Sequence, residues 1–112
     1  MENRNRRKMN KSKLIKFGAH TINHEILSYL SPKEMKKQIS LSIHKLSKEL
    51  GEKVIHFSYP EGQKDHFDSS VIKHLKAKGI VCSPSAISGV NDNNDDLFRL
   101  KRIMVGFDNM PF

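Results

Sequence analysis

Short apolar stretches at four places along the chain have the composition of β-strands. Residues 14–20 open with apolar side chains and lead into a polar loop. Residues 54–59 are rich in β-branched and aromatic side chains and are cut off by Pro60. The segments 80–82 and 100–105 show the same enrichment over shorter lengths. We therefore expect four short strands.

The stretch between the first two predicted strands has the pattern of an amphipathic helix. Ser31 is a favoured N-cap, Pro32 follows at the first helical position, and Glu34 completes a capping box. Gly51 is placed to end the helix. Between these ends, apolar residues recur at helical spacing: Met35, Ile39, Ile43, Leu46 and Leu50.

A second, shorter helix is predicted from Asp68 or Ser69 to a terminal Gly79. Its inward face is formed by Val71, Ile72 and Leu75. The polar stretch 83–96 is predicted to be a loop. Strands that alternate with helices over short connections predict an α/β fold with parallel strands and right-handed crossovers.

Composition indicates one soluble folded domain. The chain has 112 residues, of which 37% are hydrophobic and 29% charged. No apolar run approaches the roughly 20 residues that span a bilayer, and the N-terminus lacks the apolar segment of a signal peptide. Cys82 has no partner for a disulfide and follows two apolar residues, so we interpret it as a buried small side chain.

The positive charge gathers at the N-terminus. Residues 1–13 hold six of the 20 basic side chains and one of the 12 acidic ones, so the other 99 residues carry 14 basic and 11 acidic groups. We expect residues 1–13 to be a basic, flexible tail and residues 14–112 to form the domain. A basic arm can bind phosphate, but the domain lacks the interleaved aromatics of a nucleic-acid surface, which argues against a nucleic-acid partner. A protein that binds nucleic acid through this arm should lose that binding when residues 1–13 are deleted.

Two histidines directly after the first predicted strand are candidate metal ligands. His20 and His24 lie four residues apart, so both imidazoles can reach one cation if the segment turns helically. Taken alone, the pair also fits two surface or core histidines.

The second predicted strand ends in a turn at the same edge of the sheet. Tyr59-Pro60-Glu61-Gly62 follows it, and on its own this sequence is typical of a β-turn. In α/β folds, however, sites assemble at the carboxyl ends of parallel strands. The two motifs should therefore share one rim.

Together, these motifs resemble the polysaccharide deacetylase family, also called the NodB-homology domain or carbohydrate esterase family 4. The matching segments are GAHTINH at 18–24 and HFSYPEG at 56–62, separated by a helix. The segment 96–103 is similar to the end of the domain in the bacterial Tyr-Pro subgroup. The resemblance covers residues 14–105.

The resemblance implies a distorted (β/α) barrel, here partial because its first strands are lacking. It implies a hydrolase that removes acetyl groups from amide or ester positions of a polysaccharide or oligosaccharide. In this family a divalent metal, usually zinc, is held by two His and one Asp, and a second Asp acts as general base.

Carried over by position, the metal ligands are His20 and His24, with Thr21 supporting their loop. The backbone N–H of Tyr59 is the oxyanion donor, and the turn that aims it is shaped by Pro60 and Gly62. Arg102 is expected to orient a carboxylate at the site, with a surface arginine as the alternative.

The chain also departs from the family pattern. No aspartate precedes His20, and the pair Asp95-Asp96 comes near the C-terminus, in the wrong place for the catalytic aspartates. Ser58 stands where many members carry arginine, and no Leu-x-His motif supplies a general acid. We therefore expect weak zinc binding from two histidines alone.

The lack of the first strands should leave an open barrel edge. Self-association or a partner chain could cover that edge. The leading hypothesis is an incomplete deacetylase domain, and the alternative is a catalytically inactive module that binds glycan or a protein partner. Family members often work in the cell envelope, so the sequence leaves the location open.

Overall fold

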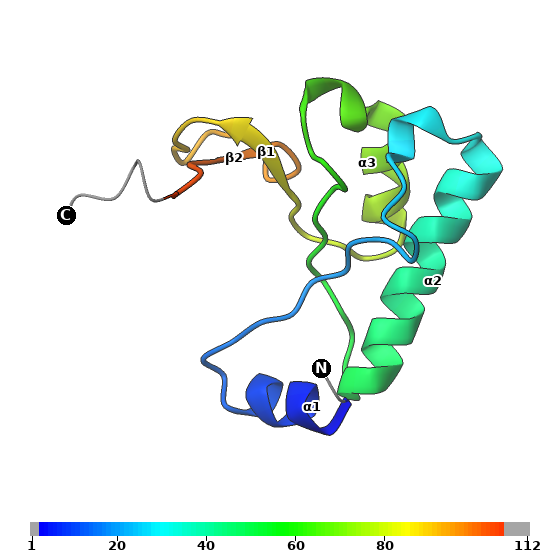
Figure 1. Ribbon diagram of the computed structural model, residues 1–112, viewed down its shortest axis with the longest axis vertical. Helices are drawn as coiled ribbons and strands as arrows, with labels where there is room; N and C mark the ends of the chain where they lie inside the picture. The colour runs from blue at the N-terminus through cyan, green and yellow to red at the C-terminus, as the bar shows by residue number, and fades with distance from the viewer. Residues whose placement is uncertain (1–2, 107–112) are drawn as a thin grey trace.

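The computed structural model describes residues 3–106 as a small α/β fold with three helices and a two-stranded sheet (Figure 1). Residues 1, 2 and 107–112, at the ends of the predicted tail and domain, lie outside the described residues. The helices are α1 (Asn3–Lys11), α2 (Pro32–Leu50) and α3 (Ser69–Ala77), and the strands are β1 (Pro84–Ser88) and β2 (Leu100–Arg102). Two single turns of 3-10 helix occur at Leu27–Tyr29 and Lys64–His66.

The predicted helix α2 is confirmed together with both of its ends. The Ser31 hydroxyl accepts a hydrogen bond from the Glu34 N–H at 3.2 Å, and Gly51 adopts the left-handed conformation with φ 74°. The Glu34 carboxylate accepts from the Gln38 side chain at 3.3 Å. The apolar face of α2 is buried against the rest of the fold.

Helix α3 is also confirmed. The Asp68 carboxylate caps it by accepting from the Val71 N–H at 3.0 Å, and Gly79 follows the last turn with φ 86°. Its buried side chains are the three predicted ones, Val71, Ile72 and Leu75. Helices α2 and α3 lie side by side in Figure 1 and cover one side of the core.

The first three predicted strands are parallel to one another but meet only at single bridges. Ala19 pairs with Phe57, and His56 pairs with Cys82. The Ala19 N–H donates to the His56 carbonyl at 2.9 Å, and the Ser58 N–H donates to the Ala19 carbonyl at 2.9 Å. Residues 14–18 take no part in a strand, so that part of the first strand prediction is wrong.

The prediction of a loop at 83–96 is wrong for its first half, because residues 84–88 form β1. This strand pairs in parallel with β2, with an irregular register between Pro84↔Leu100 and Ser88↔Arg102. The Ser85 hydroxyl donates to the Leu100 carbonyl at 2.8 Å, so a polar side chain is buried at the pairing. Strand β2 is shorter than the predicted 100–105.

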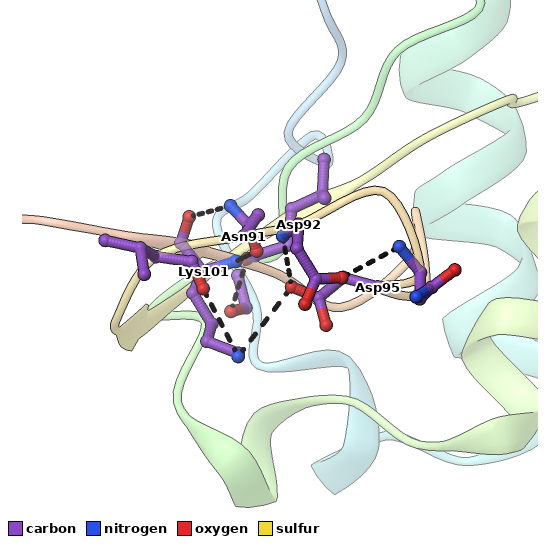
Figure 2. A network of polar contacts seen from close by, with 8 residues as sticks. Asn91, Asp92, Asp95 and Lys101 are labelled. Atoms are coloured by element: carbon purple, nitrogen blue, oxygen red, sulfur yellow. Dashed lines mark hydrogen bonds and ion pairs between the residues drawn. The ribbon is translucent and has the colours of Figure 1, made fainter.

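A loop without a helix connects β1 to β2, and a polar network ties this loop to Lys101 of β2 (Figure 2). The Asn91 side chain donates to the Lys101 carbonyl and accepts from the Lys101 N–H, both at 2.9 Å. The Asp95 carboxylate accepts from the Asp92 N–H at 2.9 Å and lies 3.9 Å from the Lys101 ammonium. The Asn91 side chain thus bonds both backbone groups of Lys101, as a residue of a neighbouring strand would do with its own backbone.

Helix α1 occupies residues for which the sequence pattern predicted no element. Its Arg6 guanidinium pairs with the Glu49 carboxylate at 2.7 Å, and Arg7 donates to the carbonyl oxygens of Glu49 and of Lys48, the latter at 3.3 Å. These cations lie at the C-terminal end of α2, where the helix dipole favours positive charge. Figure 1 shows α1 beside the C-terminal end of α2.

The core lies between helices α2 and α3 and the bridged segments. Phe57, Ile39 and Leu75 are each at most 1% exposed. Of the helices in residues 3–106, none has the length and apolar character to cross a bilayer.

Candidate functional site

The Ala19 and Phe57 bridge brings the two sequence motifs side by side. The Nδ1 atom of His20 lies 2.7 Å from the Ser58 carbonyl oxygen. Because a carbonyl can only accept, Nδ1 must carry the proton of this hydrogen bond. The other ring nitrogen, Nε2, is then left with its lone pair when the imidazole is neutral.

His24 reaches the same place by an unexpected backbone route. Its ring centroid lies 4.8 Å from that of His20, with an angle of 62° between the rings. The segment does not turn helically, because Thr21 and His24 adopt left-handed conformations with φ 70° and 56°. The Thr21 hydroxyl accepts from the His24 N–H at 3.0 Å, so Thr21 supports the loop as expected.

Gln38 is a residue of this site that the sequence reasoning missed. It projects from α2, is 4% exposed, and its side-chain oxygen accepts from the N–H groups of Ile22 and Asn23 at 3.2 Å each. The signal in the sequence was a polar residue next to Ile39 on the apolar face of a helix. A buried amide at such a position usually has hydrogen-bond partners.

The Tyr59 side chain is buried in the core. Its hydroxyl donates to the Phe98 carbonyl at 2.6 Å, and its ring stacks on Phe67 with centroids 4.1 Å apart. Burial raises the pKa of Tyr59 to about 12. The phenol therefore fixes the backbone, and within residues 3–106 the Tyr59 N–H has no hydrogen-bond acceptor.

The turn after Tyr59 is tighter than a β-turn. The Gly62 N–H donates to the Pro60 carbonyl at 2.7 Å, which closes a three-residue turn. Glu61 and Gly62 have φ 61° and 72°. The Gly62 carbonyl accepts from the Ala86 N–H at 2.8 Å, and a Cβ atom at Gly62 would lie 2.8 Å from that nitrogen. The turn is thus pinned against β1.

Arg102 reaches this region from β2. Its guanidinium donates to the Ser58 hydroxyl at 2.9 Å. An open hollow of about 450 Å³ is lined by His20, Ser58 and Arg102 together with residues of the neighbouring segments. Arg102 and His20 therefore both contact Ser58, one at its hydroxyl and the other at its carbonyl oxygen.

The two histidines have no third ligand of the usual kind beside them in the described part of the chain. Within residues 3–106, no three His, Cys, Asp or Glu side chains gather in a way that could hold a metal ion. Asp95 and Asp96 lie in the β1–β2 loop, where Asp95 pairs with Lys101 and Asp96 with Arg99. The two imidazoles can supply two nitrogen ligands to a metal ion, but among residues 3–106 no carboxylate completes the set of ligands.

Comparison with known proteins identifies a family match. The family model described as polysaccharide deacetylase matches residues 2–82. No curated protein matches the chain.

Several solved structures share the fold. The Streptococcus pyogenes deacetylase PplD, in complex with acetate, has a TM-score of 0.83 at 22% identity, covering 94% of this chain and 45% of that one. The BpsB deacetylase domain from Bordetella bronchiseptica has a TM-score of 0.82 at 16% identity, covering 94% and 49%. The polysaccharide deacetylase BC0361 from Bacillus cereus has 0.71 at 24% identity, covering 90% and 31%. The chain thus spans about half or less of each.

Proposed function

The chain belongs to the polysaccharide deacetylase family, and from that premise we propose that it is a metal-dependent hydrolase domain that removes acetyl groups from carbohydrate. The bond cleaved is an amide or an ester. The observation that carries the proposal is the meeting of His20 and His24 beside the turn that presents the Tyr59 N–H.

We propose that His20 and His24 are two ligands of a divalent metal, and that the metal is zinc, which imidazole nitrogens suit. The hydrogen bond from His20 Nδ1 to Ser58 supports this, because such a bond fixes the ring and leaves Nε2 for the metal. The close approach of the His24 ring supports it as well. A bound zinc ion supplies Lewis acidity to an acetyl carbonyl and makes water a stronger nucleophile.

The third ligand is proposed to be a carboxylate from a segment outside residues 3–106. Two facts support this: no third ligand of the usual kind joins the histidines in the described part of the chain, and the chain spans about half of the structures it matches. On the same grounds, we propose that these residues form part of a larger (β/α) barrel. The parallel order of the bridged segments fits that architecture.

The remaining roles rest on the chain's own polar groups. The Tyr59 N–H, which lacks an acceptor within residues 3–106, is available to stabilise a developing oxyanion. Pro60 and Gly62 hold the turn that fixes its direction. Arg102 brings a guanidinium to Ser58, so β2 supplies at this place the cation that many family members carry at position 58.

The proposal is tested by zinc titration calorimetry of the chain and of the His20→Ala, His24→Ala double variant. The chain should bind one zinc ion more weakly than about 1 μM, or −8 kcal/mol, because a ligand is missing. The double variant should show no binding. His44→Ala is the matched control, since His44 is an exposed histidine of α2, and it should bind as the parent does.

Equal binding by the parent and the double variant would remove the two histidines from the metal site. Binding by the parent much tighter than micromolar would place the third ligand within this chain. Either result would change the site as proposed.

A further inference from the structure

The groove between α2 and α3 is a second hollow, with no residue in common with the histidine site. It has a volume of about 360 Å³, and Lys36, Lys73 and His74 contribute to its walls together with Ser70. Met35, a buried residue of α2, contributes an apolar surface. Figure 1 shows the two helices side by side.

The charge of the groove is positive and lacks compensation. Among residues 3–106 no carboxylate lines it, and Lys36 and Lys73 are exposed. Within residues 3–106 the ion pairs involve Arg6, Arg99 and Lys101, and neither groove lysine has an acidic partner. Lys33 lies one turn before Lys36 on α2, so the positive charge continues along the same helix face.

His74 lies in the groove, close to these positive charges. It is half-buried, and its Nε2 atom lies 3.1 Å from the Ser40 hydroxyl of α2. Burial, followed by the charges of Lys78 at the end of α3 and Lys36 on α2, lowers the pKa of His74. The groups that face the ring from both helices are therefore cationic or neutral.

We propose that the groove between α2 and α3 binds the phosphate groups of a linear phosphate-bearing polymer, with Lys36 and Lys73 as the charged contacts. Lysine ammonium groups on two facing walls can hold one phosphate between them. Lys33 extends the contact to a next phosphate along α2. Charge complementarity is the basis of the proposal, which is independent of the metal site.

Binding and the protonation of His74 are linked. A phosphate in the groove offsets the charges that disfavour the imidazolium, so it raises the pKa of His74. By reciprocity, the affinity for phosphate rises as the pH falls through that pKa.

The test uses tripolyphosphate as the probe and the ring protons of His74 as the readout. Nuclear magnetic resonance titrations of the chain are recorded at constant ionic strength with tripolyphosphate, with inorganic phosphate and with chloride alone. We expect tripolyphosphate to raise the midpoint for His74, and to bind more tightly than inorganic phosphate at equal phosphate concentration. The Lys36→Gln, Lys73→Gln variant should bind it roughly tenfold more weakly.

The matched control is Lys8→Gln, Lys11→Gln, which removes the same charge from exposed positions on α1. It should bind tripolyphosphate as the parent does. Equal loss in both variants, or an unchanged His74 midpoint, would overturn the proposed site. Equal affinity for inorganic phosphate and tripolyphosphate would overturn the polymer as its ligand.

Discussion

Gln38 shows how a single buried side chain of α2 positions the loop that carries both histidines. One oxygen accepts from two successive amides of the loop, and the Glu34 carboxylate accepts from the other end of the same side chain. The identities of His20 and His24 could be read from their spacing. The role of Gln38 could not, because it depends on a loop that folds back over the helix.

Replacing Gln38 by leucine should destabilise the chain and loosen the histidine loop. The amides of Ile22 and Asn23 would lose their acceptor, but both residues are exposed and their amides can bond to water instead, so we expect a total loss of about 1 kcal/mol. Urea unfolding measures the loss. The Gln38→Glu variant keeps an acceptor oxygen and should lose less, and equal losses would show that the two hydrogen bonds contribute little.

Tyr59 should make stability depend on pH in the alkaline range. Its pKa is raised to about 12 by burial, whereas the phenol of the unfolded chain ionises near about 10. The folded state therefore keeps the phenol proton to a higher pH than the unfolded state does. The contribution of Tyr59 to the free energy of unfolding is complete below about pH 10 and is lost as the pH rises toward about 12.

The Tyr59→Phe variant isolates this effect. It should be less stable than the parent at neutral pH by about 1–2 kcal/mol, because the Phe98 carbonyl loses its donor. The difference in unfolding free energy should then shrink between about pH 10 and 12. Tyr29→Phe, at a largely exposed position, should follow the parent throughout. A difference that stays constant with pH would argue against a buried, proton-retaining phenol.

At the scale of elements, local chemistry predicted the helices that carry their own signals. Ser31, Asp68 and Gly51 are end signals that act through neighbouring backbone groups, so α2 and α3 could be placed from the sequence. Helix α1 has few apolar residues, and its contacts are made by Arg6 and Arg7 with the end of α2. Such tertiary contacts leave no periodic pattern.

Strand β1 was missed for a related reason. Its residues are PSAIS, with a proline at the start and serines at the second and last positions. Ser85 is buried because its hydroxyl bonds the Leu100 carbonyl, and hydropathy alone reads such a residue as loop. The bridged segments were predicted as strands, and their parallel direction was correct.

The turn at Gly62 should tolerate no side chain. Gly62→Ala would force a left-handed alanine and place its Cβ atom against the Ala86 nitrogen, which is backbone and cannot move aside. We expect a loss of about 2–4 kcal/mol in unfolding free energy. Gly51→Ala is the control, because φ is 74° there but no atom lies within 4 Å, and it should cost about 1 kcal/mol. Similar losses in thermal unfolding would mean that the contact with β1 does not restrict the turn.

At the scale of the molecule, the predicted α/β class and the meeting of the two motifs at one rim are both seen. Parallel bridges place residues 19, 57 and 82 in neighbouring segments, so the rim follows from topology. What lies beyond residues 3–106 could not be read from local pattern. The matched structures are about twice as long or longer, and the carboxylates proposed for the site belong to that wider context.

The hydrogen bond from His20 to Ser58 also has a kinetic meaning. It joins residues 38 positions apart, and the bond from Arg102 to Ser58 joins residues 44 apart. Closing loops of this length costs chain entropy. Helices form through local contacts and do not have this cost. The imidazole is therefore oriented only once the distant segments have docked, so the geometry around Ser58 should be among the last features to form during folding.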